Sequence, residues 1–569
     1  MPHRRCLLIA AFFAIAFLFT AAWGASAQGT KLGTVEFPTS GSGPAQEHFL
    51  RGVAAMHSFW YEEALEEFRA ATQADPSFAM GYWGEALALN HPVWQEQDTE
   101  AGRAALAKIT DSSKLNDRER AYIEAARALY GEGEKLARDR AYLAAMEKLY
   151  HDYPQDLEAA SFYSLALLGV HGYKVEGHQE RMRAGSIALE VYAKNPNHPG
   201  AAHYIIHSFD DPEHAILALP ASFRYAEIAP AAHHARHMPS HIFIQRGMWP
   251  EAAASNESAW QASVDWVASK KLHDNLRDFH SLHWLHYIYL QQGRWARAEG
   301  ILDLRRKAMT ESSDMGTGYR GRADRMWADM AAEMVVETEN WKRAAALFAD
   351  AGANKPAAGA DAQHQHAPSS GRDGGAQHTR SQILTAYVRG MAAAHQGLAE
   401  ADQARATLES MAEHARKRGD DELSSSLLVM TGEVSAVYAF QRGDRRKAIA
   451  VMEQAVQREE AMPAPSGPPD LIKPSHEVFG EILLAAGDAK RAREQFARSL
   501  TRHPNRARSL LGAARAAAAA GDSQAAADYY VQLLDVWKYA DTQMAELKEA
   551  RDFLQKNARA AGKDCAFCK

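Results

Sequence analysis

Small and aromatic residues recur along this chain at a fixed spacing that is typical of paired amphipathic helices. One set near the C-terminus is followed 34 residues later by a matching set: Gly480, Ala492 and Phe496, then Ala514, Ala526 and Tyr530. A period of this length predicts stacked helical hairpins. A single hairpin cannot bury its apolar stripe, so neighbouring pairs must stack around a continuous core. The pattern therefore predicts an all-α solenoid of antiparallel helix hairpins.

The same spacing appears near the N-terminus. Gly52, Ala64, Phe68 and Pro76 follow the start of an amphipathic segment at Gln46. Both ends of the chain are therefore expected to share one architecture, with the small residues leaving room for the aromatic rings.

Short turn signals divide the helices of the predicted hairpins. A glycine followed by Trp or Asp and then by Ala occurs at Gly247, Gly293, Gly443, Gly487 and Gly521. Glycine adopts the left-handed backbone conformation that commonly ends a helix. We expect each of these glycines to close one helix and the neighbouring aromatic residues to have a structural role.

These residues resemble the tetratricopeptide repeat family. The match is strong over residues 46–90 and 473–540 and weaker between about 100 and 345, where Ala252, Ala298 and Ala344 are 46 residues apart. Longer helices or turns are expected there. The resemblance implies a right-handed superhelix whose concave face holds a peptide or a partner protein.

The first 27 residues have the features of a secretory signal. Arg4 and Arg5 precede an apolar run from Cys6 to about Trp23, and small residues follow at 25–27. We expect cleavage near Gln28 and a periplasmic or secreted product. The alternative is a membrane anchor.

The chain is expected to contain eight segments. They are a signal peptide (1–27), N-terminal repeats (28–98), divergent His-rich repeats (99–351), a flexible insertion (352–380), further repeats (381–460), a Pro-rich linker (461–474), C-terminal repeats (475–560) and a tail (561–569).

The charge and the cysteines restrict the expected partners. The net charge of −7 becomes −9 without Arg4 and Arg5, so neither nucleic acid nor stable membrane insertion after cleavage is expected. The arginines between Arg502 and Arg508 are expected on a solvated face. Cys565 and Cys568 form a C-x-x-C that predicts a local disulfide, with a metal or redox pair as the alternative.

Histidine is concentrated in the middle of the chain, where 12 of the 26 lie between His198 and His286. His203 and His207 lie four apart on a helix that starts after Pro199. His237 precedes, and His241 begins, the helix that starts at Met238-Pro239. If these helices are neighbours, the four imidazoles could bind one transition metal ion, zinc or copper.

The same histidines could instead cap carbonyl groups, stack on aromatic rings or bond Asp210 and Asp211 in a polar core. His280, His283 and His286 belong to an apolar segment that is expected to be buried.

Two functions follow from these patterns. The first is an exported repeat protein that binds a partner and carries a His-rich metal site. The second is a metal-dependent enzyme on the same scaffold, with Asp210, Asp211 or Glu213 as acid or base. No protease, hydrolase, P-loop or dinucleotide motif occurs, so the sequence specifies neither a substrate nor a catalytic residue.

Overall fold

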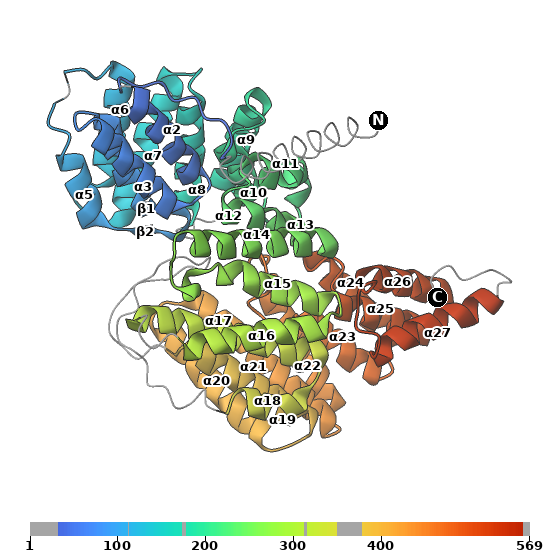
Figure 1. Ribbon diagram of the computed structural model, residues 1–569. Coiled ribbons are helices and arrows are strands. Elements are labelled where there is room, and N and C mark those ends of the chain that lie inside the picture. The colour runs from blue at the N-terminus through green and yellow to red at the C-terminus, as the bar shows by residue number, and fades with distance from the viewer. Residues whose placement is uncertain are drawn as a thin grey trace, which may run out of the picture.

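The computed structural model shows an all-α chain in which consecutive helices pack against one another (Figure 1). The structure describes residues 32–41, 43–111, 113–172, 178–311, 316–349 and 378–560. The signal peptide, most of the flexible insertion with His364 and His366, and the C-x-x-C tail lie outside these residues. Those predictions therefore remain predictions.

The first half of the chain consists of α2 (Gly43–His57), α3 (Tyr61–Ala74), α4 (Ala79–Ala88), α5 (Thr99–Ala107), α6 (Asp117–Leu129), α7 (Lys135–Asp152), α8 (Leu157–His171), α9 (Gln179–Lys194), α10 (Pro199–Ser208), α11 (Ala215–Ile228), α12 (His233–His237), α13 (Pro239–Gln245) and α14 (Trp249–Ser269). Strands β1 (Asn90–His91) and β2 (Glu96–Gln97) pair antiparallel around the 3-10 helix η1 (Pro92–Trp94).

The second half consists of η2 (Asp274–Leu276), α15 (Phe279–Gln291), α16 (Trp295–Thr310), α17 (Gly316–Thr338), η3 (Trp341–Arg343), α18 (Ala344–Leu347), α19 (Arg380–His395), α20 (Glu400–Lys417), α21 (Asp421–Gln441), α22 (Arg445–Glu460), α23 (Ser475–Ala485), α24 (Ala489–Arg502), α25 (Ala507–Ala519), α26 (Ser523–Val536) and α27 (Ala545–Ala560).

The small and aromatic residues of the repeat pattern pack directly on one another. A Cβ at Gly480 would lie 2.8 Å from the Phe496 ring, and a Cβ at Gly52 would lie 2.7 Å from the Phe68 ring. Both rings are fully buried. The expected contact between the two helices of a hairpin is therefore present at both ends of the chain.

The glycine turns have the expected backbone conformation. Gly247 has φ +63° and Gly293 has φ +69°, and each separates two helices of the central repeats. At Gly247 a side chain would also meet the Pro504 carbonyl oxygen at 2.5 Å. The longer central repeats are explained by the long helices α14 and α17, of 21 and 23 residues.

The C-terminal repeats pack against the start of α14 and against the turn that follows α15. The Trp249 indole donates to the Asn505 carbonyl at 2.9 Å, and the Asp541 amide donates to the Gly293 carbonyl at 2.9 Å. Figure 1 shows α23 and α24 next to the end of α15, with α25 to α27 beyond them. The chain thus folds back, so that segments about 250 residues apart in sequence are in contact.

Arg506 corrects one expectation. The arginines between Arg502 and Arg508 were expected on a solvated face, but the Arg506 side chain has no exposed surface. It bonds both carboxylate oxygens of Glu477, at 2.8 and 3.2 Å, and donates to the Tyr287 hydroxyl at 3.2 Å. A buried bidentate ion pair satisfies the charge that solvent would otherwise hydrate.

One described helix, α21, is long and apolar enough to cross a membrane by length and composition alone. In the fold it packs between α20 and α22, and its apolar residues contribute to the core.

Candidate metal centre

Pro199 and the capping residue His198 fix the start of α10 and so the positions of His203 and His207. Pro199 occupies the first turn of α10, and the His198 side chain accepts a hydrogen bond from the Ala201 amide. The helix therefore starts where the sequence predicts, with His203 and His207 one turn apart on one face. Pro239 similarly starts α13, and His241 lies in its first turn.

His237 lies directly before Met238 and Pro239, as the sequence predicts. It is also the last residue of α12, a helix of five residues that begins at His233. α12 therefore carries three histidines, His233, His234 and His237, and His234 lies less than one turn before His237.

A first group of three histidines, which we call the α10 site, joins His203, His207 and His234. The Nε2 atom of His203 lies 3.1 Å from Nε2 of His207 and 3.2 Å from Nε2 of His234. His203 is fully buried, and the other two are half-buried.

A second group, which we call the α13 site, joins His237, His241 and His280. The Nε2 atom of His237 lies 3.2 Å from Nε2 of His241 and 3.1 Å from Nε2 of His280, which comes from α15. His237 and His241 are buried, and His280 is half-buried.

His203 is the central ring of the α10 site and His237 is the central ring of the α13 site, because each contacts the other two rings of its group. Each central ring carries its proton on Nδ1, the nitrogen that is not used in these contacts. Nδ1 of His203 donates to the His57 carbonyl at 2.8 Å, and Nδ1 of His237 donates to the Asn256 amide oxygen at 2.7 Å. The Asn256 amide nitrogen donates to Ala252, which fixes its orientation. Nε2 of each central ring therefore presents a lone pair to the site, as metal-bound histidines do.

The buried rings of His237 and His241 are uncharged at neutral pH. Burial, and next the neighbouring His241, lowers the pKa of His237 to about 3. Burial also lowers the pKa of His241 to about 3. Neutral imidazole is the form that coordinates a metal ion.

The distances between the nitrogens fit one ion in each site. Two imidazoles bound at metal–nitrogen distances of about 2.0–2.1 Å with tetrahedral angles have nitrogens about 3.3 Å apart. The four closest pairs of Nε2 atoms lie 3.1 to 3.2 Å apart. In each site the Nε2 lone pair of the central ring faces two other imidazoles. This arrangement suits a cation that all three rings share better than a hydrogen bond, which would involve only one of the two neighbours.

The structure thus distributes the four predicted histidines over two sites. His203 and His207 belong to the α10 site, and His237 and His241 belong to the α13 site. The sites are neighbours, because the His207 and His241 ring centroids lie 6.2 Å apart and those of His234 and His237 lie 6.0 Å apart.

The sequence analysis missed the third histidine of each site, His234 and His280. The spacing of three between His234 and His237 was a usable signal, since such residues share a helix face. His280 carried no signal that separates it from His283, because only the packing of α15 decides which histidine reaches the site.

His283 and His286 have a different partner. They bond the two oxygens of the buried Glu333, at 2.9 and 3.0 Å. Burial acts against ionisation of Glu333, but the charges and hydrogen bonds of His283 and His286 lower its pKa. His283 and His286 thus fit the alternative in which the histidines bond carboxylates in a polar core.

A third group, His57, Glu158 and His198, is fully buried behind the α10 site. Glu158 bonds His57 at 2.7 Å and His198 at 3.1 Å. The other ring nitrogens contact the Tyr204 hydroxyl and accept from the Ala201 amide. Because both nitrogens of each ring have protein partners, this group is a hydrogen-bond network that holds the His57 carbonyl against His203.

The three acidic residues that were candidates for an acid or base have different partners. Nδ1 of His241 lies 2.6 Å from an Asp210 oxygen, so Asp210 supports the His241 ring. Burial raises the pKa of Asp210 to about 7. Asp211 bonds Arg181 and His214 instead. The Glu213 amide donates to Asp211, and the Glu213 side chain is exposed.

Aromatic rings cover the two sites. The Phe59 ring lies 4.2 Å from the His203 ring, and the Trp284 ring lies 4.1 Å from the His241 ring. Such apolar cover limits access of water to a metal centre and lowers the local dielectric.

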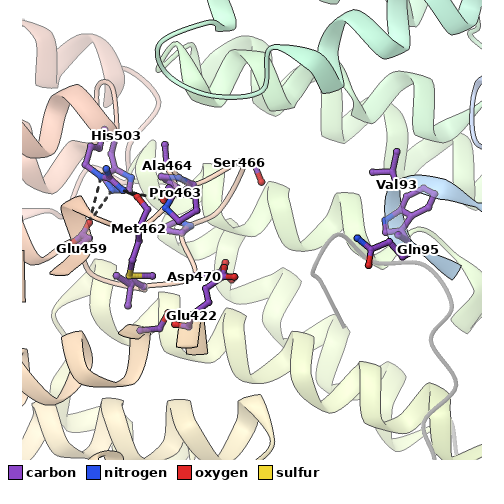
Figure 2. A pocket seen from close by; sticks show the side chains of 16 residues that line it. Val93, Gln95, Glu422, Glu459, Met462, Pro463, Ala464, Ser466, Asp470 and His503 are labelled. Atoms are coloured by element: carbon purple, nitrogen blue, oxygen red, sulfur yellow. Dashed lines mark hydrogen bonds and ion pairs between the residues drawn. The ribbon is translucent and has the colours of Figure 1, made fainter. Parts of the chain in front are cut away.

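Two cavities lie beside the sites and share a wall at Pro465, Ser466, Pro469 and Asp470. The smaller, of about 110 Å³, is lined by His280 and Trp284. The larger, of about 320 Å³, runs from η1 to the C-terminal repeats. Figure 2 shows Val93 and Gln95 on one side of it and Glu459, Met462 and His503 on the other.

No family model matches the chain, and no curated protein is similar to it. Solved structures with similarity include a tetratricopeptide repeat protein from Parabacteroides merdae at a TM-score of 0.27 and 13% identity, over 55% of this chain and 93% of that chain. They also include two structures of a human IFIT1 dimer at a TM-score of 0.32 and 13% identity. One, with PPP-AAAA, is matched over 87% of this chain and 91% of that chain. The other, with m7Gppp-AAAA, is matched over 89% and 92%. Similarity at this level does not transfer their ligands to this chain.

Proposed function

We propose that this protein is a copper-binding helical repeat protein that holds two neighbouring copper ions, one in the α10 site and one in the α13 site. The observation that carries this proposal is the convergence of six Nε2 atoms in two groups of three. The outer nitrogens of His203 and His237 donate to protein oxygens, which supports coordination through Nε2.

The ligand set favours copper over zinc. All six ligands are imidazoles, which suit both metals, and neither group contains a carboxylate. Two divalent ions would bring four positive charges into a largely buried region with neutral ligands. Two Cu(I) ions bring only two, and the cost of burying charge falls accordingly.

We also propose that the protein is exported and that its repeats bind a partner on their concave face. The basic start and apolar run of residues 1–27 support export. The helical repeat architecture supports partner binding only by association.

Metal analysis tests the proposed centre. The untagged protein is stripped with chelator, reloaded anaerobically with excess Cu(I), desalted and analysed for copper per chain. We expect two ions in the wild type and one in each of the variants His234→Ala and His280→Ala.

His283→Ala is the matched control, because His283 lies on the same helix as His280 but bonds Glu333. It should retain two ions. A wild type that retains no copper would overturn the proposal, and so would loss of copper in the control to the same extent as in His280→Ala.

A further inference from the structure

The Pro-rich segment between α22 and α23 lies against the α13 site. We infer that residues 463–469, which we call the strap, close this site and limit how fast its copper ion exchanges. This inference rests on the proposed copper centre and adds control of metal exchange to it. The contacts of the strap with Trp284 and Gln245 carry the inference.

The middle of the strap packs on the ring that covers His241. A Cβ at Gly467 would lie 2.5 Å from the Trp284 ring, so only glycine lets the backbone approach this closely. The centroid of the Trp284 ring in turn lies 4.1 Å from that of His241 and 4.8 Å from that of His237. One aromatic ring therefore separates the backbone of the strap from two histidines of the α13 site.

Hydrogen bonds also join the strap to this site. The Gln245 side-chain amide donates to the Pro465 carbonyl at 2.6 Å and to an Asp210 oxygen at 3.3 Å. The other oxygen of Asp210 lies 2.6 Å from Nδ1 of His241. The position of the strap is therefore linked to the His241 ring through two side chains.

The strap forms part of the wall of the cavity at His280. Residues 466–468 line this cavity of about 110 Å³ together with His280. Asp329 and Arg380 place charged groups in the same wall, so the cavity suits water and ions. Movement of the strap would therefore widen or narrow the space through which a metal ion or a chelator reaches His280.

Side chains of other helices hold the strap by its carbonyl groups. Four of its seven residues are prolines, which have no backbone N–H to donate. Arg502 donates to the Pro463 carbonyl at 3.2 Å, and Arg380 donates at 2.7 Å to the carbonyl of Asp470, directly after the strap. A segment held in this way opens at a lower free energy than the helices of a core. The strap can therefore open while the repeats stay folded.

The test measures how fast copper leaves the α13 site. His234→Ala protein is loaded anaerobically with Cu(I) and desalted, so that it carries the α13 ion alone, and is mixed with an excess of a coloured Cu(I) chelator. The same protein with Gly467→Ala added is measured beside it. The added methyl group should push the strap away from Trp284 and speed release about tenfold, which corresponds to about 1.4 kcal/mol of strap closure.

Two controls show whether the effect is specific. Gly300→Ala is the matched substitution, because a Cβ at Gly300 meets no atom within 4 Å, and it should leave the release rate unchanged. His280→Ala protein, which keeps the α10 ion, should release that ion at the same rate with and without Gly467→Ala. Equal acceleration of release from both sites would overturn the inference, because it would show a general loosening of the fold.

Arg502→Gln separates the strap from a direct effect of Gly467→Ala on Trp284. Arg502 lies in α24 and holds the strap by the Pro463 carbonyl, so its replacement should also speed release from the α13 site. It decides the test if Gly467→Ala fails to load copper. Unchanged release in Arg502→Gln, with copper retained, would overturn the strap. Failure of both the wild type and His234→Ala to retain copper would instead overturn the proposed centre.

Discussion

Asp210 contacts His241 through the ring nitrogen that faces away from the α13 site, at 2.6 Å between Oδ2 and Nδ1. A carboxylate in this position orients an imidazole ligand and increases its basicity. Gln245 holds the other oxygen of Asp210 at 3.3 Å.

We predict that Asp210→Asn weakens copper binding to the α13 site about 10- to 100-fold, since such supporting partners typically contribute this much to metal affinity. The α10 site should keep its affinity. Competition titration with a Cu(I) chelator would resolve the two ions. Asp211→Asn is the matched control, because Asp211 bonds His214 and Arg181 and neither is a ligand.

The stability of the metal-free protein should fall in acid. The pKa values of His237 and His241 are about 3 in the folded chain against an ordinary value of 6.5, so the unfolded chain binds more protons between these values. Their contribution is complete above pH 6.5 and is lost as the pH falls toward 3.

Each of the two histidines should cost up to about 1.4 kcal/mol of unfolding free energy per pH unit within that range. Urea unfolding of chelator-treated protein at pH 7 and pH 5 measures this loss. His237→Gln should make the curve less steep. Asp210, whose pKa is raised, contributes with the opposite sign in both proteins. An equal change in stability between pH 7 and pH 5 in the wild type and in His237→Gln would therefore contradict the prediction.

The network behind the α10 site should be structural. Burial acts against ionisation of Glu158, but His198 and His57 hold its pKa well below the usual range. Glu158→Gln removes the charge that pairs with both rings, and breaking a buried pair typically costs about 3–5 kcal/mol. We expect a clear fall in Tm while copper-loaded protein still holds two ions. Loss of an ion together with an unchanged Tm would show that this group binds metal.

Arg506 should hold the C-terminal repeats in place. Burial disfavours its charged form, but Glu337 and Glu477 raise its pKa far above the ordinary value. Arg506→Ala leaves Glu477 buried without this partner, and Arg506→Lys cannot reproduce the bidentate bond.

Both Arg506 variants should therefore be destabilised, the alanine variant by about 3–5 kcal/mol. Thermal unfolding and limited proteolysis near α23 would measure this effect. Arg498→Ala serves as control, because Arg498 is exposed and pairs with Glu460 on the surface. Equal effects of Arg498→Ala and Arg506→Ala would contradict the assignment.

The sequence alone determined the features that depend on neighbours along the chain. The spacing of Gly480 and Phe496 predicted a helix hairpin because both residues belong to one pair of adjacent helices. Pro199 and Pro239 predicted where α10 and α13 begin, since proline is restricted to the first turn of a helix. The concentration of histidine between His198 and His286 indicated the region of the candidate site.

Only the tertiary structure decided how these residues combine. His203 meets His234 across 31 residues, and His237 meets His280 across 43, because the fold brings single residues of α10, α12 and α15 together. Local spacing gives the face of a helix on which a ring lies but not which neighbouring helix it meets. Arg506 shows the same limit, because its burial depends on contacts with Glu477 and Tyr287 that form only when the C-terminal repeats fold back onto α15.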